Sequence, residues 1–131
     1  MTTIVILGAS PKPERYAYQA QRRLLSAGYH VLPINPGHQN IGGIRCYPDL
    51  SSVGALGQTI AAVTLYVGPD RLRPLISELI ALQPGCIIAN PGADEPELLT
   101  ELRSGGMRVI AACTLVLLAR GDFSHVLEGA R

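Results

Sequence analysis

The sequence predicts an α/β protein in which an open parallel sheet of about five strands carries helices on both faces. Short apolar runs alternate along the chain with amphipathic patterns of helical period. The first run, residues 4–7, passes directly into a glycine turn, as in the opening βα unit of nucleotide-binding folds. Four predicted strand ends carry the Gly- and Pro-containing turns GASP, NPG, VGP and NPG, at residues 8–11, 35–37, 67–69 and 90–92.

Length and composition are typical of one folded domain spanning residues 1–131. Hydrophobic residues make up 47% and charged residues 16%, which argues against disorder. The net charge of +1 offers no electrostatic case for a nucleic-acid or membrane-surface partner. No apolar run approaches the roughly 20 residues of a membrane span. No basic segment precedes the first apolar run, so we expect no signal peptide and a cytoplasmic location.

The first half of the chain begins with the strand at residues 4–7. Residues 15–27 have one apolar face, and Gly28 stands where a left-handed helix cap is expected, so this segment predicts the first helix. Residues 29–33 are rich in strand formers and predict the second strand. Residues 39–52 are the least regular part, with a turn at Gly42-Gly43 and a possible short strand at residues 44–47. Ser51-Ser52 are expected to cap a short helix that runs to Leu56.

The second half has clearer signals. The apolar, β-branched run at residues 59–67 predicts a strand buried on both faces. Residues 71–82 predict one amphipathic helix, and residues 95–104 predict another that has Asp94 as its N-cap and Pro96 in its first turn. Residues 85–90 and 107–112 predict the last two strands. A short helix is expected at residues 114–120, and the tail from Gly121 shows no pattern.

The Gly- and Pro-containing turns suggest a binding site. In open α/β sheets, ligands bind beyond the carboxyl ends of the strands, where the strand order reverses. Ordinary connecting loops also collect Gly and Pro, so each turn alone says little. Because parallel strands place all four turns at one edge of the sheet, we expect a cleft there in which a ligand approaches the backbone closely.

The first turn favours phosphate over a dinucleotide motif. Gly8 is present, but the second and third glycines of Gly-x-Gly-x-x-Gly are missing, and so is a P-loop. Asn35-Pro36 stands where an NAD site has an acidic residue. The backbone of residues 8–10, the Ser10 hydroxyl and the cations Lys12 and Arg15 suit a phosphate. The alternative for these two cations is a solvated start of the helix.

We find no catalytic set and no metal site in the sequence. The three histidines, His30, His38 and His125, have no partner at motif spacing. The three cysteines are odd in number and widely spaced, unlike a disulfide framework or a metal site. Cys113 follows the last predicted strand. It could face the cleft and meet a ligand thiol, or be a small buried hydrophobe, which is the usual role of a free cysteine.

Several stretches together resemble the small stand-alone CoA-binding proteins, whose Rossmann-like fold is similar to the N-terminal domain of the succinyl-CoA synthetase alpha subunit. The matching residues cover nearly the whole chain: Gly8-Ala9-Ser10-Pro11 with Lys12-Pro13-Glu14-Arg15 and Tyr18, Gly28-Tyr29-His30-Val31 with Pro33-Ile34-Asn35-Pro36, Gly42-Gly43 with Cys46-Tyr47-Pro48-Asp49-Leu50, Pro91-Gly92-Ala93, and Cys113. There are departures. Tyr16-Ala17 replaces the family's usual Pro-Ser pair, and Asn90 stands where glutamine is common.

The resemblance implies that coenzyme A lies across the strand ends. Gly8, Ser10 and Arg15 would hold phosphate, and Asn35 and Pro36 would border the nucleotide end. Residues 67–69 would flank the adenine, and residues 90–92 would close the other side of the cleft. The full expected binding set is Gly8, Ala9, Ser10, Lys12, Arg15, Asn35, Pro36, Val67, Gly68, Pro69, Asn90, Pro91 and Gly92.

Three functions are compatible with these observations. The leading one is non-catalytic binding of CoA or an acyl-CoA, as a carrier, sensor or regulatory module. The second is an NAD(P)-binding domain or small oxidoreductase, which the missing glycines and missing acid disfavour. The third is a protein-interaction domain that has kept the fold without the ligand, for which Tyr16-Ala17 is the supporting feature. A homodimer is a possible assembly.

Overall fold

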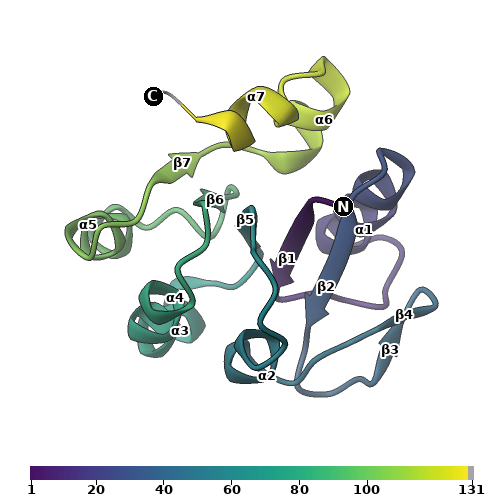
Figure 1. Ribbon diagram of the computed structural model, residues 1–131, viewed down its shortest axis with the longest axis horizontal. Helices are drawn as coiled ribbons and strands as arrows, with labels where there is room; N and C mark the ends of the chain where they lie inside the picture. Colours follow the sequence, from purple (N-terminus) through teal and green to yellow (C-terminus); the bar gives the residue numbers. More distant parts are fainter. Residues whose placement is uncertain (130–131) are drawn as a thin grey trace.

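The computed structural model describes residues 1–129 and shows a parallel sheet between two layers of helices (Figure 1). The sheet order is β2-β1-β5-β6-β7, and all four neighbouring pairs are parallel. This confirms the predicted Rossmann-like α/β fold. The strands are β1 (Thr3–Leu7), β2 (His30–Ile34), β5 (Ala62–Leu65), β6 (Cys86–Ala89) and β7 (Val109–Ala111). Chain order reverses between β1 and β5, so the switch point lies above these two strands.

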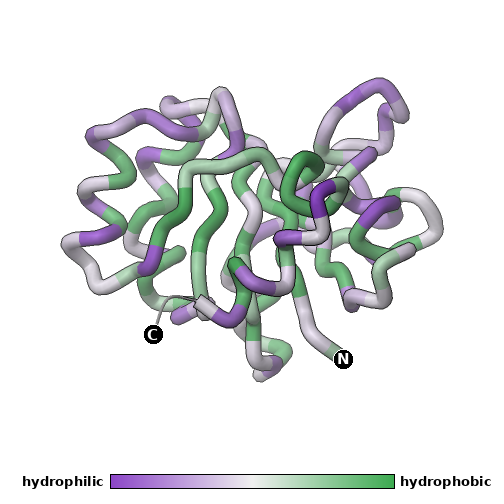
Figure 2. The backbone as a smooth tube through the Cα atoms, turned by 90° about the horizontal axis from the view of Figure 1, so that it is seen from above, coloured by the Kyte–Doolittle hydropathy of each residue, from purple (hydrophilic) through white to green (hydrophobic). Residues whose placement is uncertain are grey.

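The helices divide between the two faces of the sheet. One face carries α1 (Tyr16–Ser26), α6 (Thr114–Arg120) and α7 (Phe123–Glu128), and α6 packs against both of the others. The other face carries α2 (Leu50–Gly54), α3 (Pro69–Leu72), α4 (Ile76–Leu82) and α5 (Pro96–Ser104). Hydrophobic residues concentrate along the strands, while hydrophilic residues lie on the outer turns (Figure 2).

The strands are buried on both sides, which explains their nearly continuous apolar runs. In β1, Ile4 and Ile6 belong to the core under α1, whereas Val5 and Leu7 belong to the core under α2 to α5. This alternation follows from the period of two of a β-strand. All four residues of β5 are buried. Two hydrophobic layers therefore hold β1 and β5 rigidly below the switch point.

The predicted helix at residues 71–82 is wrong as one continuous helix. The structure divides it into α3, a 3₁₀ turn (Arg73–Leu75) and α4. Pro74 lies in the middle turn, and proline lacks the N–H that an α-helix uses and clashes with the preceding turn. The break makes α3 a short separate element directly after the β5 turn, and it starts at Pro69 rather than at Arg71.

Two predicted helix caps are also wrong. Asp49, and not Ser51 or Ser52, caps α2: its Oδ1 accepts hydrogen bonds from the Ser52 N–H at 2.8 Å and the Ser52 hydroxyl at 2.6 Å. The N-cap position of α5 is Glu95, and Asp94 instead accepts a hydrogen bond from the Gly92 N–H at 3.2 Å. In both cases the helix starts at a different residue than expected; the Asp49 side chain caps α2, whereas no side chain caps α5.

The irregular segment after β2 contains an antiparallel hairpin of β3 (Asn40–Ile41) and β4 (Ile44–Arg45) around Gly42-Gly43. The tail, for which the sequence showed no pattern, forms α7. Its Phe123 is 2% exposed and packs edge-on against Tyr29, with 5.2 Å between ring centroids.

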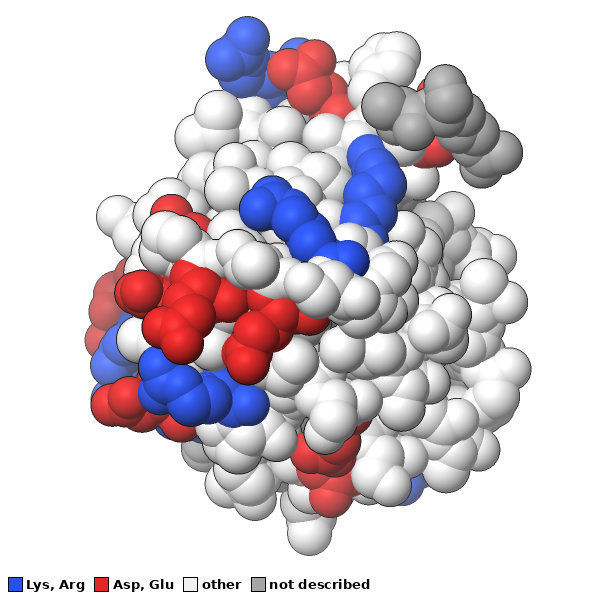
Figure 3. Space-filling model, turned by 90° about the vertical axis from the view of Figure 1, so that its left-hand side faces the viewer, with Lys and Arg blue, Asp and Glu red and all other residues white. Residues whose placement is uncertain are grey.

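Charge on the helices is mixed. Acidic and basic side chains lie side by side on the face of the molecule that includes α5 (Figure 3). Among residues 1–129, no helix has the length and apolar character needed to cross a membrane.

Candidate functional site

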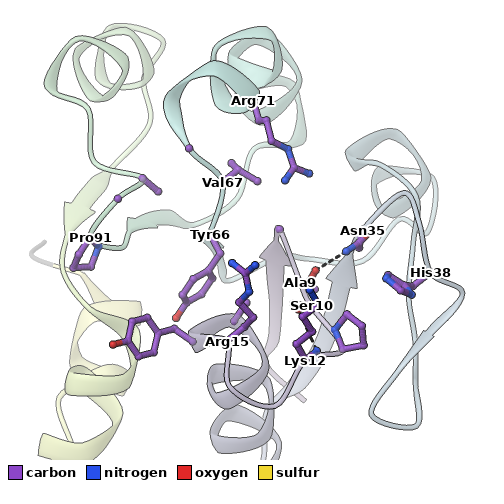
Figure 4. A pocket seen from close by; sticks show the side chains of 17 residues that line it. Ala9, Ser10, Lys12, Arg15, Asn35, His38, Tyr66, Val67, Arg71 and Pro91 are labelled. Atoms are coloured by element: carbon purple, nitrogen blue, oxygen red, sulfur yellow. Dashed lines mark hydrogen bonds between the residues drawn. The ribbon is translucent and has the colours of Figure 1, made fainter.

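A cavity of about 530 Å³ opens at the switch point, above the carboxyl ends of β1 and β5. Its lining includes Gly8, Ala9 and Ser10 after β1, and Tyr66, Val67 and Gly68 after β5. Cavities of roughly 300–1,000 Å³ hold small molecules and cofactors in proteins. The site predicted from the strand-end turns thus coincides with a cavity of suitable size (Figure 4).

Ten of the 13 predicted binding residues line this cavity together. They are Gly8, Ala9, Ser10, Lys12, Arg15, Asn35, Val67, Gly68, Pro91 and Gly92. Pro36 lines a smaller neighbouring cavity, whereas Pro69 and Asn90 lie outside both linings. The remaining lining residues, which sequence reasoning did not include in the binding set, are Pro11, Tyr16, Ala17, His38, Tyr66, Arg71 and Ala93.

Gly8 brings the β1 loop close to the β5 loop. Its φ is +94°, and a Cβ placed on it would lie 2.6 Å from the Tyr66 carbonyl oxygen. Only glycine adopts this conformation readily and leaves that space open. The N–H groups of Gly8 and Ala9 both donate to the Ile34 carbonyl, at 3.2 and 3.0 Å. These two donors therefore hold the loop against β2 and are already occupied.

The start of α1 carries groups of the kind that bind anions in proteins. Its N-cap, Arg15, makes no side-chain capping hydrogen bond, and Ala17 in the first turn lines the cavity. The first N–H groups of a helix lack partners within the helix and carry partial positive charge. The Ser10 hydroxyl lies nearby and accepts a hydrogen bond from the Lys12 N–H at 3.2 Å. Ser10, Arg15 and the first turn of α1 thus lie in one part of the cavity lining, an arrangement that suits a phosphate.

The lining of the cavity is positively charged. Its 17 lining residues include three side-chain cations, Lys12, Arg15 and Arg71, and no Asp or Glu. The formal charge of the lining is therefore +3, from three cations and no acids, whereas the whole chain has +1. Clefts lined by one sign of charge concentrate ligands of the opposite sign. The binding set predicted from the sequence lacks Arg71, because residues 71–82 were predicted to form one helix with Arg71 on its solvent-facing side.

Asn35 and Asn90 each brace the loops around the cavity. The Asn35 amide donates to the Ala9 carbonyl at 2.8 Å, and its Oδ1 accepts from the Gly37 N–H at 2.8 Å. Asn90 is 2% exposed and donates to the Thr64 hydroxyl at 2.7 Å and the Leu65 carbonyl at 2.8 Å. Its Oδ1 accepts from the Thr114 N–H at 2.8 Å, so it ties β5 and β6 to the start of α6.

Tyr66 lies on the side of the cavity nearer Pro91 (Figure 4). Its hydroxyl oxygen is buried and makes no hydrogen bond of good geometry among residues 1–129, although the Thr114 and Thr64 side chains are close enough to lower its pKa a little. Burial raises the pKa of the phenol to about 12. The group is therefore protonated at neutral pH and can act as a hydrogen-bond donor.

The smaller neighbouring cavity, which we name the annex, has a volume of about 160 Å³. Gly8, Val67 and Arg71 line both cavities and form their shared wall. The other residues of the annex are Leu7, Ile34, Pro36, Pro48, Asp49, Leu50 and Leu75. Most of these side chains are apolar, and the annex is below the roughly 300 Å³ of a typical ligand pocket. It suits one flat apolar ring of a larger ligand.

Among residues 1–129, the titratable groups show no grouping typical of catalysis or metal binding. His38 lines the cavity, whereas His30 lies in β2 and His125 in α7. Within residues 1–129, no group of three or more His, Cys, Asp or Glu residues is arranged to hold a metal ion. Cys113 is at the N-cap of α6 and lies outside the lining of both cavities. Cys46 and Cys86 are buried thiols, and burial raises the pKa of each.

The chain is similar to proteins from several organisms. It is 31% identical to a protein of known structure from Thermus thermophilus, with a TM-score of 0.83 over 91% of this chain and 89% of that one. A conserved hypothetical protein from Pyrococcus furiosus is 26% identical, with a TM-score of 0.77 over 88% of this chain and 98% of that one. The uncharacterised protein YneT of Bacillus subtilis is 23% identical over 107 residues, which are 82% of this chain and 77% of that protein.

The family match covers most of the chain. The sequence profile described as the CoA binding domain matches residues 2–119, which include all five strands of the sheet and every residue of both cavities. This agrees with the predicted resemblance and with the cavity at the switch point. The chain therefore belongs to the CoA binding domain family.

Proposed function

We propose that the protein binds coenzyme A, or an acyl-CoA, across the carboxyl ends of β1 and β5. The observation that carries this proposal is the cavity at the switch point, which has three side-chain cations and no acid in its lining. Coenzyme A is a polyanion with an apolar base and a long, weakly polar arm. Its phosphates would be attracted by the positive lining, and membership of the family supports the choice of ligand.

The two ends of the ligand would occupy different surroundings. The pyrophosphate would meet the start of α1, the Ser10 hydroxyl and Arg15. The adenine would enter the annex, between Pro36 and Val67. The pantetheine arm would run toward Tyr66 and residues 91–92 on the opposite side. Pro69 and Asn90 would support the site indirectly, since Pro69 starts α3 and Asn90 ties β6 to β5.

A non-catalytic role is the form of the proposal that fits the lining best. His38 is the single histidine of the cavity lining, and no carboxylate of the lining accompanies it. General acid–base catalysis by a pair of side chains requires two such groups within hydrogen-bond reach of the substrate. A carrier, sensor or regulatory module needs binding alone. A cytoplasmic location and pairing into a homodimer stay predictions from the sequence.

NAD(P) is the second candidate ligand. Rossmann-type dinucleotide sites carry an acidic residue after the second strand to hold the ribose hydroxyls. Here Asn35 and Pro36 follow β2, and the Asn35 side chain is already bonded to Ala9 and Gly37. This geometry favours CoA over NAD. A protein-interaction domain without ligand is the third candidate, and it requires that the cavity stay empty in solution.

Calorimetric titration of the reduced protein with CoA, NAD, NADP and ATP distinguishes these candidates. We expect CoA to bind at micromolar affinity and more tightly than the other three. Arg15→Ala removes a charge-assisted hydrogen bond that contributes about 1.5–3 kcal/mol, so affinity should fall about ten- to a hundredfold. Arg22→Ala is the matched control, because Arg22 is an exposed residue of the same helix outside the cavity lining. Equal affinity in the Arg15→Ala protein would refute the phosphate assignment, and absence of CoA binding would refute the function.

A further inference from the structure

Arg71 is the one cation that lines both the cavity at the switch point and the annex. It belongs to α3, and its side chain extends from that helix toward the loops after β1 and β2 (Figure 4). Arg15 and Lys12 lie on the opposite side of the opening, at the start of α1. Within residues 1–129 the Arg71 guanidinium makes no ion pair. Its charge is therefore available to a ligand.

The position of Arg71 corresponds to a definite part of a nucleotide. An apolar base in the annex and a pyrophosphate at the start of α1 leave the ribose between them, at the shared wall of Gly8, Val67 and Arg71. Coenzyme A differs from most adenine nucleotides in that its ribose carries a 3′-phosphate. A phosphomonoester has a charge of about −1.5 to −2 at neutral pH, and arginine binds it with two parallel N–H donors.

Asp49 limits where that phosphate can lie. Asp49 lines the annex, and its carboxylate is held at the start of α2 by the two hydrogen bonds from Ser52, which lower the pKa of this carboxyl group. A negative charge therefore lies beside the annex at neutral pH, and it disfavours a phosphate there. The base can still enter, because it is uncharged. The phosphate is then favoured at the boundary, where Arg71 lies and where the large cavity has no acidic residue.

We infer that Arg71 is a specificity-determining residue that recognises the 3′-phosphate of the ligand's ribose, so that the site selects 3′-phosphorylated adenine nucleotides over their dephosphorylated forms. This inference rests on the proposed function and deepens it. The cluster at the start of α1 binds the pyrophosphate that both forms share. Arg71 supplies the contact that only the 3′-phosphorylated form can make.

Titration of the wild-type protein and the Arg71→Ala variant with CoA and with 3′-dephospho-CoA tests the inference. The wild type should bind CoA at least tenfold more tightly than 3′-dephospho-CoA. Arg71→Ala should lower the affinity for CoA tenfold or more, leave the affinity for 3′-dephospho-CoA unchanged, and so remove the preference. Adenosine 3′,5′-bisphosphate, which lacks the pantetheine arm, should lose affinity by the same factor as CoA.

Arg73→Ala is the matched control. Arg73 directly follows α3 and lies outside both cavities, so its loss should leave both affinities unchanged. Because Arg71 and Arg73 are exposed, both variants should fold, as circular dichroism can verify. An equal loss of affinity for both ligands in Arg71→Ala, or no loss, would overturn the inference while CoA binding stands. So would a preference that persists in Arg71→Ala and disappears in His38→Ala. A wild type that binds no CoA overturns the proposed function and this inference together.

Discussion

At the level of single residues, Gly8 and Gly28 form an informative pair. Both have a left-handed backbone, with φ of +94° and +91°. A Cβ on Gly8 would approach the Tyr66 carbonyl oxygen to 2.6 Å, whereas a Cβ on Gly28 would meet no atom within 4 Å. Alanine therefore has a similar conformational penalty at both positions, but it has a steric penalty at position 8 alone.

We expect Gly8→Ala to lower the free energy of unfolding by about 1–3 kcal/mol more than Gly28→Ala, because overpacking a tight contact costs about that much. Urea unfolding of both variants measures the difference. The added Cβ should also push the β1 and β5 loops apart and weaken CoA binding. Equal losses of stability in the two variants would show that the backbone conformation alone requires glycine at position 8.

For Tyr66→Phe we expect the opposite change in stability from that of Gly8→Ala. The buried Tyr66 hydroxyl makes no hydrogen bond of good geometry among residues 1–129 and interacts only weakly with the Thr114 and Thr64 side chains. A buried polar group that is poorly satisfied costs up to about 1–3 kcal/mol. We therefore expect Tyr66→Phe to raise the free energy of unfolding of the ligand-free protein by about 1 kcal/mol. Tyr16→Phe is the control, because Tyr16 is 70% exposed and should leave stability unchanged. A loss of stability in Tyr66→Phe would contradict the expectation, and urea unfolding measures both.

The raised pKa of Tyr66 also predicts that the stability of the protein falls at alkaline pH. Burial raises the pKa of Tyr66 from 10.0 to about 12, so the folded state favours the protonated phenol. The stability from this preference is complete below pH 10 and is lost as the pH rises through about 12. In a titration followed by tyrosinate absorbance, one of the five tyrosines should ionise near pH 12. That late step should be missing in Tyr66→Phe, and a late step that persists there would assign it to another tyrosine.

At the level of the elements, one buried side chain connects α1 with the β3–β4 hairpin. Gln21 is 0% exposed, and its Nε2 donates to the Ile41 carbonyl at 2.8 Å. Two-stranded hairpins are marginal alone, so this one depends on its contacts with the rest of the chain. These contacts include the Gln21 bond, the burial of Ile41 and the backbone hydrogen bonds of Tyr47 to Pro33 and Asn35. Gln21 therefore helps to fix an element that follows the cavity-lining loop after β2.

We expect Gln21→Ala to lower the free energy of unfolding by about 1 kcal/mol, because it leaves the Ile41 carbonyl without its partner but also removes the buried, unpartnered Gln21 Oε1. Amide hydrogen exchange should become faster in residues 40–45 and stay unchanged in β1 and β5. Gln19→Ala is the matched control on the same helix, since Gln19 is exposed. Uniformly faster exchange throughout the sheet would show instead that Gln21 supports the whole core.

The elements also show which local features a sequence reveals. The helix at residues 114–120 was predicted with its observed bounds, and the first helix within a residue at each end, because apolar spacing and glycine caps are local signals. The break at Pro74 was missed because the apolar spacing of residues 71–82 continues across it. The helix α7 was missed because its helical pattern is short, and its packing partner, Tyr29, is far away in the sequence.

At the level of the whole molecule, binding of CoA should raise the thermal stability of the protein. A ligand that binds the folded state stabilises it by about 2.7 kcal/mol at a hundred times its Kd, which is roughly 10 °C in Tm for a chain of this size. We expect CoA at that concentration to raise Tm by this amount, and NAD at the same concentration to leave it unchanged. Arg15→Ala should show a smaller shift with CoA. A Tm that does not respond to CoA would contradict binding to the folded protein.

The sequence by itself determined the alternation of strands and helices, the five-stranded parallel sheet and ten of the residues that meet at the cavity, because these follow from local periodicity and from turns at strand ends. Only the tertiary structure decided that β1 and β5 are neighbours, that Asn90 braces the sheet, and that Arg71 joins the cavity from across the opening. The physical reason is that neighbours in space depend on strand order and on packing between distant segments, which the spacing of residues along the chain does not specify.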